Sequence, residues 1–398
     1  MRKIELLSPV GNWEMLVAAV EAGANSVYLG IKGLNMRERA NNFSIEDLKK
    51  ITDYAHKNKV RVYLTVNTII FDEELKIIKD ILTAAKKAKV DAIICWDLAV
   101  ISLCKKLKLE IHLSTQGSSS NAESIKLYKK LGVKRFVIAR ECSLEQVKDL
   151  SKKADIEVFA HGAMCVSVSG RCFLSQFLYG DKTSANRGKC IQPCRRSYIV
   201  KDSETDKELK IDNHYIMSPK DLCTLPFIEK LIKSNVKCLK IEGRARSPEY
   251  VKIVTEVYRR AIDSYYSKKL DKTLKKKLMD KLKTVYNRGF SSGFYLGKPI
   301  NEWTKDYGSR ATKKKTYIGK ITNFYKKISV AEIRINTGKV SIRDNILIIG
   351  PTTGVHEQKV SAIQIDKKKT PKSAKKGQVI GVKVSKVCRK NDKVYLFK

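Results

Sequence analysis

Four cysteines lie close together in a stretch of the chain that shows little hydrophobic periodicity. They are the thiols of HGAMCVSVSGRCFLSQFLYGDKTSANRGKCIQPCRRSY, residues 161–198: Cys165, Cys172, Cys190 and Cys194. Thiolates are soft ligands, so four that converge would suit zinc or an iron–sulfur cluster. Structural zinc usually takes two tight Cys-x2–4-Cys pairs, and only Cys190 and Cys194 are spaced that tightly, which favours a cluster gathered from loops. The alternative is small buried apolar side chains or a single nucleophile, but the glycine, serine and arginine around these thiols leave little core to fill.

The chain as a whole has the character of an intracellular protein. Its 398 residues are enough to form a hydrophobic core that needs no disulfide bonds for stability. In a reducing compartment, its ten cysteines favour metal binding or redox chemistry over disulfides. Residues 1–20 lack the apolar segment and small-residue cleavage site of a signal peptide, and no run approaches 18 apolar residues. We therefore expect a cytoplasmic protein without a membrane partner.

The elements that must position the thiols alternate between strands and helices. Amphipathic stretches such as SIEDLKKITDYAHKNK carry apolar residues three and four positions apart, as core-facing helices do. Eight short β-branched runs separate such stretches: residues 3–9, 26–30, 61–67, 92–97, 110–116, 135–141, 157–162 and 238–244. Alternating units form a parallel sheet, and eight of them predict a closed (β/α)8 barrel of the TIM type. An open doubly wound sheet is the alternative fold.

Many of the predicted strands end in a polar or ionisable residue. These residues are Asn67, Asp97, Gln116, Glu141, His161, Glu242 and Arg244. In a barrel the carboxyl ends of the strands meet on the face where active sites are built, so we expect the side chains to converge there. For any one of them, capping of the next helix is the simpler explanation.

The spacing between the seventh and eighth predicted strands is far longer than between the others. It is about 75 residues, and this insertion, at about 163–236, contains the clustered thiols. Loops that long inside a compact domain are usually functional. With the helices that follow the eighth strand, we expect a catalytic domain over residues 1–304. From residue 315 to 398 the pattern changes to period-two strands and turns, which predict a small antiparallel β-barrel.

Positive charge dominates the chain. The formal net charge is +39, from 80 Lys and Arg against 41 Asp and Glu. Residues 305–398 hold 24 Lys and Arg against 6 Asp and Glu, so 24 − 6 gives +18, close to half of the total. Solvated lysine-rich helix faces would explain a uniform excess, but a basic appended module favours RNA or DNA as the partner.

Several motifs resemble one known family when they are taken in order along the chain. The segment EVFAHGAMCVSVSGRCFLSQF closely resembles the signature of peptidase family U32, whose members are called collagenase-like. ELLSPVGN, GANSVYLG, STQGSSSN, SPKDLC, KIEGR and NRGFSSGF fit the same family over about residues 4–300. A barrel with a basic C-terminal β-module resembles the branch that hydroxylates tRNA.

The resemblance implies oxygen-independent hydroxylation, in this branch at the 5-position of a wobble uridine. Other branches imply a cytidine of ribosomal RNA or a quinone precursor as the substrate. A 4Fe–4S cluster is implied, with Cys165, Cys172, Cys190 and Cys223 as its ligands when the family pattern is carried over. The place of Cys194 stays open, because the family often shows the Cys190 and Cys194 pair while four ligands suffice. Prephenate is the implied oxygen donor, and the reductant protein is unknown.

Roles for the remaining site residues follow from their chemistry. We expect His161 and Glu242 to transfer protons, with Glu141 as a further catalytic candidate. Asn67 and Gln116 would read a base edge or a donor hydroxyl. Arginine forks match carboxylates bidentately, so the proposed substrate-binding residues are Arg140, Arg171 and Arg244.

Two other functions compete with tRNA hydroxylation. A U32-type peptidase would need a nucleophile with its base, and Cys165 with His161 is the pair the sequence offers. A non-catalytic RNA-binding protein would use the thiols for a structural metal site. The convergence of polar strand ends argues against the second of these.

Overall fold

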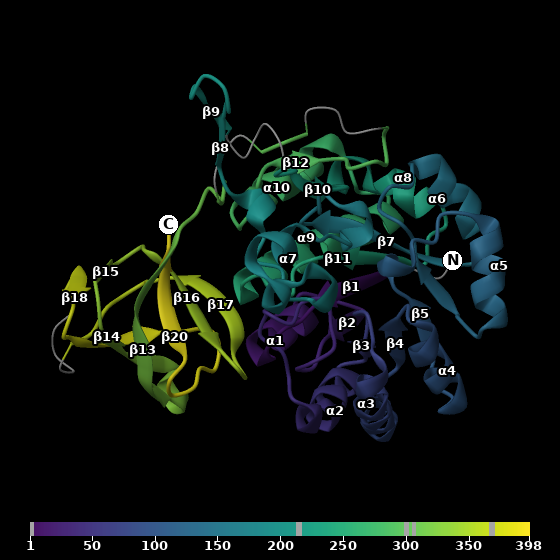
Figure 1. Cartoon of the computed structure of the whole chain (residues 1–398). Coiled ribbons are helices and arrows are strands. Elements are labelled where there is room, and N and C mark those ends of the chain that lie inside the picture. Colours follow the sequence, from purple (N-terminus) through teal and green to yellow (C-terminus); the bar gives the residue numbers. More distant parts are fainter. Residues whose placement is uncertain (1–3, 212–216, 298–301, 305–307, 366–370) are drawn as a thin grey trace.

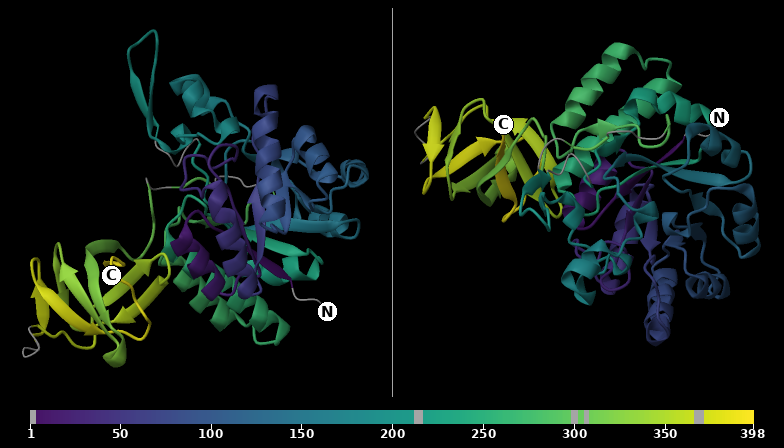
Figure 2. Two further views of the ribbon diagram at one scale, coloured as in Figure 1. Left: turned by 90° about the horizontal axis from the view of Figure 1, so that it is seen from below. Right: turned by 45° about the horizontal axis from the view of Figure 1, so that its top comes forward.

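The structure is a computed structural model that describes residues 4–211, 217–297, 302–304, 308–365 and 371–398 (Figure 1). A barrel of strands and helices occupies one side of the molecule, and a second sheet built from the C-terminal residues lies beside it (Figures 1 and 2). Within the described residues, no helix is long and apolar enough to cross a membrane.

Eight parallel strands form the barrel. They are β1 (Glu5–Pro9), β2 (Ser26–Leu29), β3 (Arg61–Thr65), β4 (Ala92–Cys95), β5 (Ile111–Leu113), β6 (Arg135–Val137), β7 (Asp155–Gly162) and β11 (Cys238–Ile241). The order is β11-β1-β2-β3-β4-β5-β6-β7, and β7 pairs in parallel with β11. That last pairing closes the sheet, so the predicted (β/α)8 barrel is confirmed and the open sheet is wrong.

Helices cover the outside of the barrel. They are α1 (Trp13–Glu21), α2 (Leu48–Lys57), α3 (Leu75–Lys87), α4 (Leu98–Lys106), α5 (Ala122–Lys130), α6 (Leu144–Ser151), α8 (Ile228–Lys233), α9 (Pro248–Tyr266) and α10 (Lys272–Lys283). In α3, Ile78, Ile81, Leu82 and Ala85 are buried at the spacing of one helix face. Asp97 accepts hydrogen bonds from the first turn of α4, so this strand end caps a helix.

Ionised side chains fill the lower part of the barrel interior. Glu5 accepts from Tyr63 at 2.6 Å and pairs with Arg135 at 3.0 Å, and Lys240 pairs with Glu157 at 2.8 Å. Glu157 is fully buried. Because the interior is filled, an open site can form only above this layer, at the carboxyl ends of the strands.

The predicted insertion joins β7 to β11. Its elements are α7 (Leu174–Tyr179), β8 (Tyr198–Lys201), β9 (Glu208–Ile211) and β10 (Asp221–Cys223). The β8–β9 hairpin projects from the molecule, and β10 pairs antiparallel with the end of β7 and parallel with β12 (Phe290–Ser291) (Figure 1). The insertion is therefore anchored directly above the barrel.

The C-terminal residues form a separate antiparallel sheet. Its strands are β13 (Lys315–Tyr325), β14 (Val330–Ile335), β16 (Asn345–Gly350), β17 (Gly354–Lys359), β19 (Val379–Lys383) and β20 (Lys393–Phe397). The order is β17-β16-β20-β13-β14-β19, and β15 (Lys339–Ser341) pairs with β18 (Ser373–Lys375). The predicted antiparallel strands are confirmed, although among the described residues no ladder joins β17 to β19 to close the sheet.

The C-terminal sheet packs against the first helix of the barrel. A Cβ on Gly354 would lie 2.7 Å from Val17 of α1, so glycine allows the close approach. Lys252 of α9 donates to the carbonyl of Val355 at 3.0 Å, and Lys386 pairs with Glu21. These contacts hold a basic module next to the barrel.

Candidate active site

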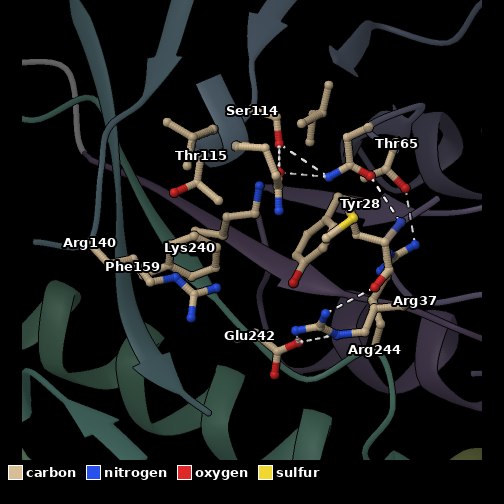
Figure 3. Close-up of a pocket in the computed structure, with 15 residues that line it drawn as sticks. Tyr28, Arg37, Thr65, Ser114, Thr115, Arg140, Phe159, Lys240, Glu242 and Arg244 are labelled. Atoms are coloured by element: carbon tan, nitrogen blue, oxygen red, sulfur yellow. Dashed lines mark hydrogen bonds and ion pairs between the residues drawn. The ribbon is translucent and has the colours of Figure 1, made fainter. Parts of the chain in front are cut away.

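A small cavity opens at the carboxyl ends of the barrel strands (Figure 3). Its volume is about 50 Å³, which accommodates a group the size of a carboxylate. The polar side chains that line it are Tyr28, Arg37, Thr65, Asn67, Ser114, Thr115, Gln116, Arg140, Lys240, Glu242 and Arg244. The strand ends therefore bring together Asn67, Gln116, Arg140, Glu242 and Arg244, as the sequence predicts.

Glu242 binds Arg37 at this mouth (Figure 3). The Arg37 Nε donates to Glu242 Oε1 at 3.1 Å, and Arg37 Nη2 lies 3.0 Å from the same oxygen. Burial alone would raise the pKa of Glu242, but attraction to Arg37, Arg246 and Arg140 outweighs it and holds the pKa below the ordinary value. Glu242 is therefore a carboxylate at neutral pH, able to accept a proton but not to supply one.

Two further arginines at the mouth have no carboxylate partner among the described residues. Arg244 donates to Thr65 Oγ1 at 3.0 Å, and burial lowers its pKa to about 10. Arg140 donates to the carbonyl of Ala163 at 2.9 Å and stacks on Phe159, with its carbon 3.9 Å from the ring centre. Its Nε is buried without a hydrogen-bond partner. Buried guanidinium groups in this state favour an anionic ligand.

The amides of Asn67 and Gln116 bind neighbouring groups of the protein. Asn67 Nδ2 donates to Ser114 Oγ at 3.1 Å and to Gln116 Oε1 at 3.2 Å. Asn67 Oδ1 accepts from the backbone of Met36 at 3.2 Å. These bonds hold the loop that carries Arg37 against the mouth, so Asn67 acts as a positioning residue.

A second cavity, of about 190 Å³, adjoins the mouth and contains the clustered thiols. Cys165, Cys172, Cys190 and Cys194 all line it, and Arg37, Gln116 and Arg140 line both cavities. Backbone N–H groups donate to two of the sulfurs: Leu174 to Cys172 at 3.4 Å and Gln192 to Cys190 at 3.3 Å. Hydrogen bonds of this kind tune thiolate ligands of iron–sulfur clusters.

The four thiols do not form a site for a single metal ion. In the described part of the chain, no three His, Cys, Asp or Glu side chains stand close enough to hold one metal ion. The second cavity leaves about 190 Å³ of open space beside the four thiols. Burial raises the pKa of Cys190 and of Cys194, so these thiols need a cation or cluster to ionise fully at neutral pH.

Cys223 lies apart from these four thiols. It ends β10, is 2% exposed, and contacts Tyr258 Oη at 3.7 Å and Met279 Sδ at 3.8 Å. Burial raises its pKa to about 11. It does not line the second cavity, whereas Cys194 does.

His161 is placed away from the mouth, contrary to the expectation from its position at a strand end. Its ring lies among aromatic rings, 5.5 Å from Tyr258, 5.6 Å from Phe290 and 6.1 Å from Tyr250. Burial lowers its pKa to about 3, so the imidazole is neutral at physiological pH. No histidine is among the described residues that line the two cavities, and proton transfer by His161 has no geometric support.

A bulge in β7 explains where His161 points. Lys240 pairs with Phe159, but the next residue of β11, Ile241, pairs with His161, so Ala160 is an extra residue. An extra residue reverses the alternation of side chains along a strand. Phe159 faces the mouth, and His161 consequently faces α9.

The other two predicted residues also lie outside the mouth. Arg171 is exposed and donates to Ser118 Oγ at 2.9 Å, so it is not placed to bind a ligand beside Arg244. Glu141 lines a third cavity, of about 360 Å³, together with Arg140 and Cys165. Its Oε1 accepts from the backbone of Ser169 at 3.0 Å. Arg140 therefore lies at the junction of all three cavities.

Six polar residues of the mouth were not predicted from the sequence: Tyr28, Arg37, Thr65, Ser114, Thr115 and Lys240. Arg37 lies in the irregular loop after β2, where no periodicity points to it. Tyr28 and Lys240 lie inside strands, and Lys240 Nζ stands 4.4 Å from the centre of the Tyr28 ring. Thr65 ends β3. Alternation along β2, β3 and β11 could have identified the three strand residues as facing the interior.

The fold and the site together define a closed (β/α)8-barrel protein. Its cationic mouth lies beside four thiols, which are a candidate site for a metal cluster. The chain belongs to peptidase family U32, whose sequence model matches residues 11–305. The resemblance seen in the motifs is thus confirmed.

Relatives of the chain carry two kinds of name. A collagenase of Porphyromonas gingivalis is 45% identical, over 99% of this chain and 97% of its own. The tRNA hydroxylation protein P1 of Bacillus subtilis is 36% identical, over 81% of this chain and 78% of its own. A 23S rRNA 5-hydroxycytidine synthase of Escherichia coli is 34% identical, over 68% of this chain and 41% of its own.

Proposed function

We propose that this protein hydroxylates RNA, with the 5-position of a wobble uridine in tRNA as its target. The observation that carries the proposal is the second cavity, in which four thiols meet beside a cationic barrel mouth. Relatives named for hydroxylation of tRNA and rRNA support the reaction class.

A 4Fe–4S cluster fits the second cavity through Cys165, Cys172, Cys190 and Cys194. The fit rests on the shared cavity and on the N–H donors to sulfur. When bound, such a cluster supplies one-electron redox chemistry and a Lewis-acidic iron next to the barrel mouth. Arg37 and Arg140 line the same cavity and offset the negative charge of four thiolates.

Prephenate is the proposed oxygen donor, and the barrel mouth is its proposed anchor. Arg140 and Arg244 are cations without carboxylate partners among the described residues, and each matches a carboxylate of the donor. Replacing a ring C–H by C–OH removes two electrons from the base, and the donor that yields its oxygen takes them up. The Glu242 carboxylate lines the mouth where the donor would bind, so we assign it the uptake of a proton during the transfer; the proton then passes to the new hydroxyl group, so the reaction releases none.

The C-terminal sheet is the proposed tRNA-binding surface. Lys320 of β13 pairs in register with Arg334 of β14 and with Lys393 of β20, and all three side chains are exposed. Like charges placed opposite each other destabilise a sheet, and phosphate groups would relieve the repulsion. Phosphate contacts of this kind would give affinity that depends strongly on salt.

A peptidase remains the second candidate, because the collagenase of Porphyromonas gingivalis matches 99% of this chain. Within the described residues, His161 donates to or accepts from Tyr258 at 3.4 Å and is shielded by aromatic rings. An imidazole with a pKa of about 3 is a weak base for activating Cys165. The geometry therefore favours hydroxylation.

Expression in a bacterium that lacks wobble-uridine hydroxylation tests the proposal. Nucleosides from its purified tRNA should contain 5-hydroxyuridine or its derivatives once this chain is present, and Cys194→Ala should abolish the gain. Hydroxycytidine in ribosomal RNA with unchanged tRNA would indicate that rRNA is the substrate. The absence of a new nucleoside from both RNAs would contradict the proposal.

A further inference from the structure

The third cavity, of about 360 Å³, has the composition of a site for a flat heterocycle. Apolar and aromatic side chains line most of it: Met164, Val168, Phe294 and Trp303. Its volume lies in the range of small-molecule pockets, whereas the barrel mouth is several times smaller. The third cavity therefore has more room for a whole base than the mouth does.

Two polar side chains of this cavity have unused hydrogen-bonding capacity. Glu141 Oε2 and Arg140 Nε are both buried without a partner among the described residues. Unsatisfied buried polar atoms are rare in folded proteins, and ligand binding is one explanation for them. The edge of a pyrimidine offers the complement, since its carbonyl oxygens accept from arginine and its ring N–H donates to a carboxylate.

The wall that carries Trp303 is tied to the insertion by backbone bonds. The amide of Lys220 donates to the carbonyl of Glu302 at 2.9 Å, and Pro219 and Trp303 form an antiparallel bridge. Lys220 Nζ also pairs with Glu302 at 2.8 Å. The backbone that carries the Trp303 ring is thus tied to the insertion.

We propose that the third cavity binds the extruded uracil ring of the substrate RNA, with Trp303 as its stacking partner and Glu141 and Arg140 at its edge. This inference rests on the proposed function. Enzymes that modify bases take the base out of its stack and hold it between aromatic or apolar side chains. Cys165 lines both this cavity and the second one, so a ring bound here would lie beside the thiols.

Binding of two RNAs that differ only in one base tests the inference. The probes are an anticodon stem-loop with uridine at the wobble position and the same RNA with an abasic site there, measured by fluorescence anisotropy with the full chain under anaerobic conditions. We expect the abasic RNA to bind about tenfold more weakly to the wild type, since base stacking on an aromatic residue has an effect of this order. Trp303→Ala should bind the two RNAs equally.

Two control variants make the result specific. Trp303→Phe should keep most of the discrimination, because an aromatic ring remains. Phe173→Ala removes an aromatic side chain that is 73% exposed and outside the cavity, and it should discriminate as the wild type does. Full discrimination by Trp303→Ala, or none by the wild type, would overturn the inference.

The assay separates this inference from the proposed function because binding needs neither donor nor turnover. If discrimination between the two RNAs depends on Trp303 but the protein does not hydroxylate tRNA, the uracil-binding inference stands and the proposed function is wrong. If the protein hydroxylates tRNA but Trp303→Ala still discriminates between the two RNAs, the proposed function stands and the uracil-binding inference is wrong.

Discussion

Arg37 and Glu242 form an ion pair across the barrel mouth, from a loop and a strand end that are 205 positions apart in the sequence. The pair leaves Arg140 and Arg244 as the cations of the mouth without a carboxylate partner among the described residues. One carboxylate thus keeps one arginine occupied while two others remain available to an anion.

Replacement of Glu242 by glutamine should lower the rate of hydroxylation about 100-fold, the usual contribution of a proton-transferring group. The free energy of unfolding should fall by about 1–2 kcal/mol, less than for a fully buried pair, since the Arg37 side chain is 38% exposed. Initial rates and urea unfolding measure the two effects.

Glu249→Gln is the matched control for Glu242→Gln. Glu249 is similarly buried and pairs with Lys315 at 2.8 Å, and it does not line the mouth. It should cost a similar free energy of unfolding and leave the rate unchanged. A wild-type rate for Glu242→Gln would remove the proton-accepting role.

His161 should make the protein less stable as the pH falls below about 6.5. The imidazole stays neutral in the folded protein, where its pKa is about 3, but it binds a proton in the unfolded chain, so acid favours unfolding. His161→Phe should reduce the pH slope of the unfolding free energy by up to about 1.4 kcal/mol per pH unit between pH 6 and pH 4. Denaturant melts at several pH values measure the slope.

The same variant separates structure from catalysis. His161→Phe should retain hydroxylation within a few-fold, because His161 faces α9 and not the mouth. Loss of activity without loss of stability at pH 7 would return His161 to the catalytic machinery. Glu242 does not affect the difference in slope between the two proteins, because both contain it. Its lowered pKa stabilises the folded state above about pH 4.5, and this stabilisation is lost as the pH falls below that value.

The barrel and part of its mouth could be predicted from the sequence. Periodicity identifies all eight strands, and the rule that barrel sites form at strand ends locates Glu242, Arg244, Asn67 and Gln116. The rule fails for His161 because a single extra residue in β7 reverses the direction of the side chain. No local sequence pattern predicts this bulge.

Other parts of the site depend on contacts between distant segments. Arg37 enters from an irregular loop, so only the folded chain shows that it meets Glu242. The spacing of the cysteines is compatible with either Cys194 or Cys223 as the fourth thiol. Cys223 packs against Tyr258 and Met279 and does not line the second cavity, and sequence spacing contains no information on that packing.

Iron analysis of two cysteine variants should distinguish the fourth thiol. Anaerobically purified Cys194→Ala should lose iron and sulfide, because it removes a thiol from the second cavity. Cys223→Ala should keep the iron of the wild type and lose about 1 kcal/mol of unfolding free energy, the effect of emptying a small buried volume. Loss of iron in Cys223→Ala with retention in Cys194→Ala would reverse the assignment.

Neutralising the cationic row of the C-terminal sheet should weaken binding of tRNA. With Lys320→Gln and Arg334→Gln combined, the slope of log K against log salt should decrease by about 2, one for each phosphate contact. The free energy of unfolding should stay constant or rise, because two like charges that face each other are removed. Lys105→Gln with Lys106→Gln, at the end of α4, is the control and should leave the slope unchanged.

The central claim is that the thiol cavity and the barrel mouth together transfer oxygen to RNA. The most direct test incubates the anaerobically purified, iron-loaded protein with unmodified tRNA and prephenate, and analyses the nucleosides by mass spectrometry. We expect wobble uridine heavier by one oxygen atom, dependent on prephenate and lost in Cys194→Ala. Unmodified tRNA from the same preparation, together with cleavage of collagen that requires Cys165, would contradict the account and establish the peptidase.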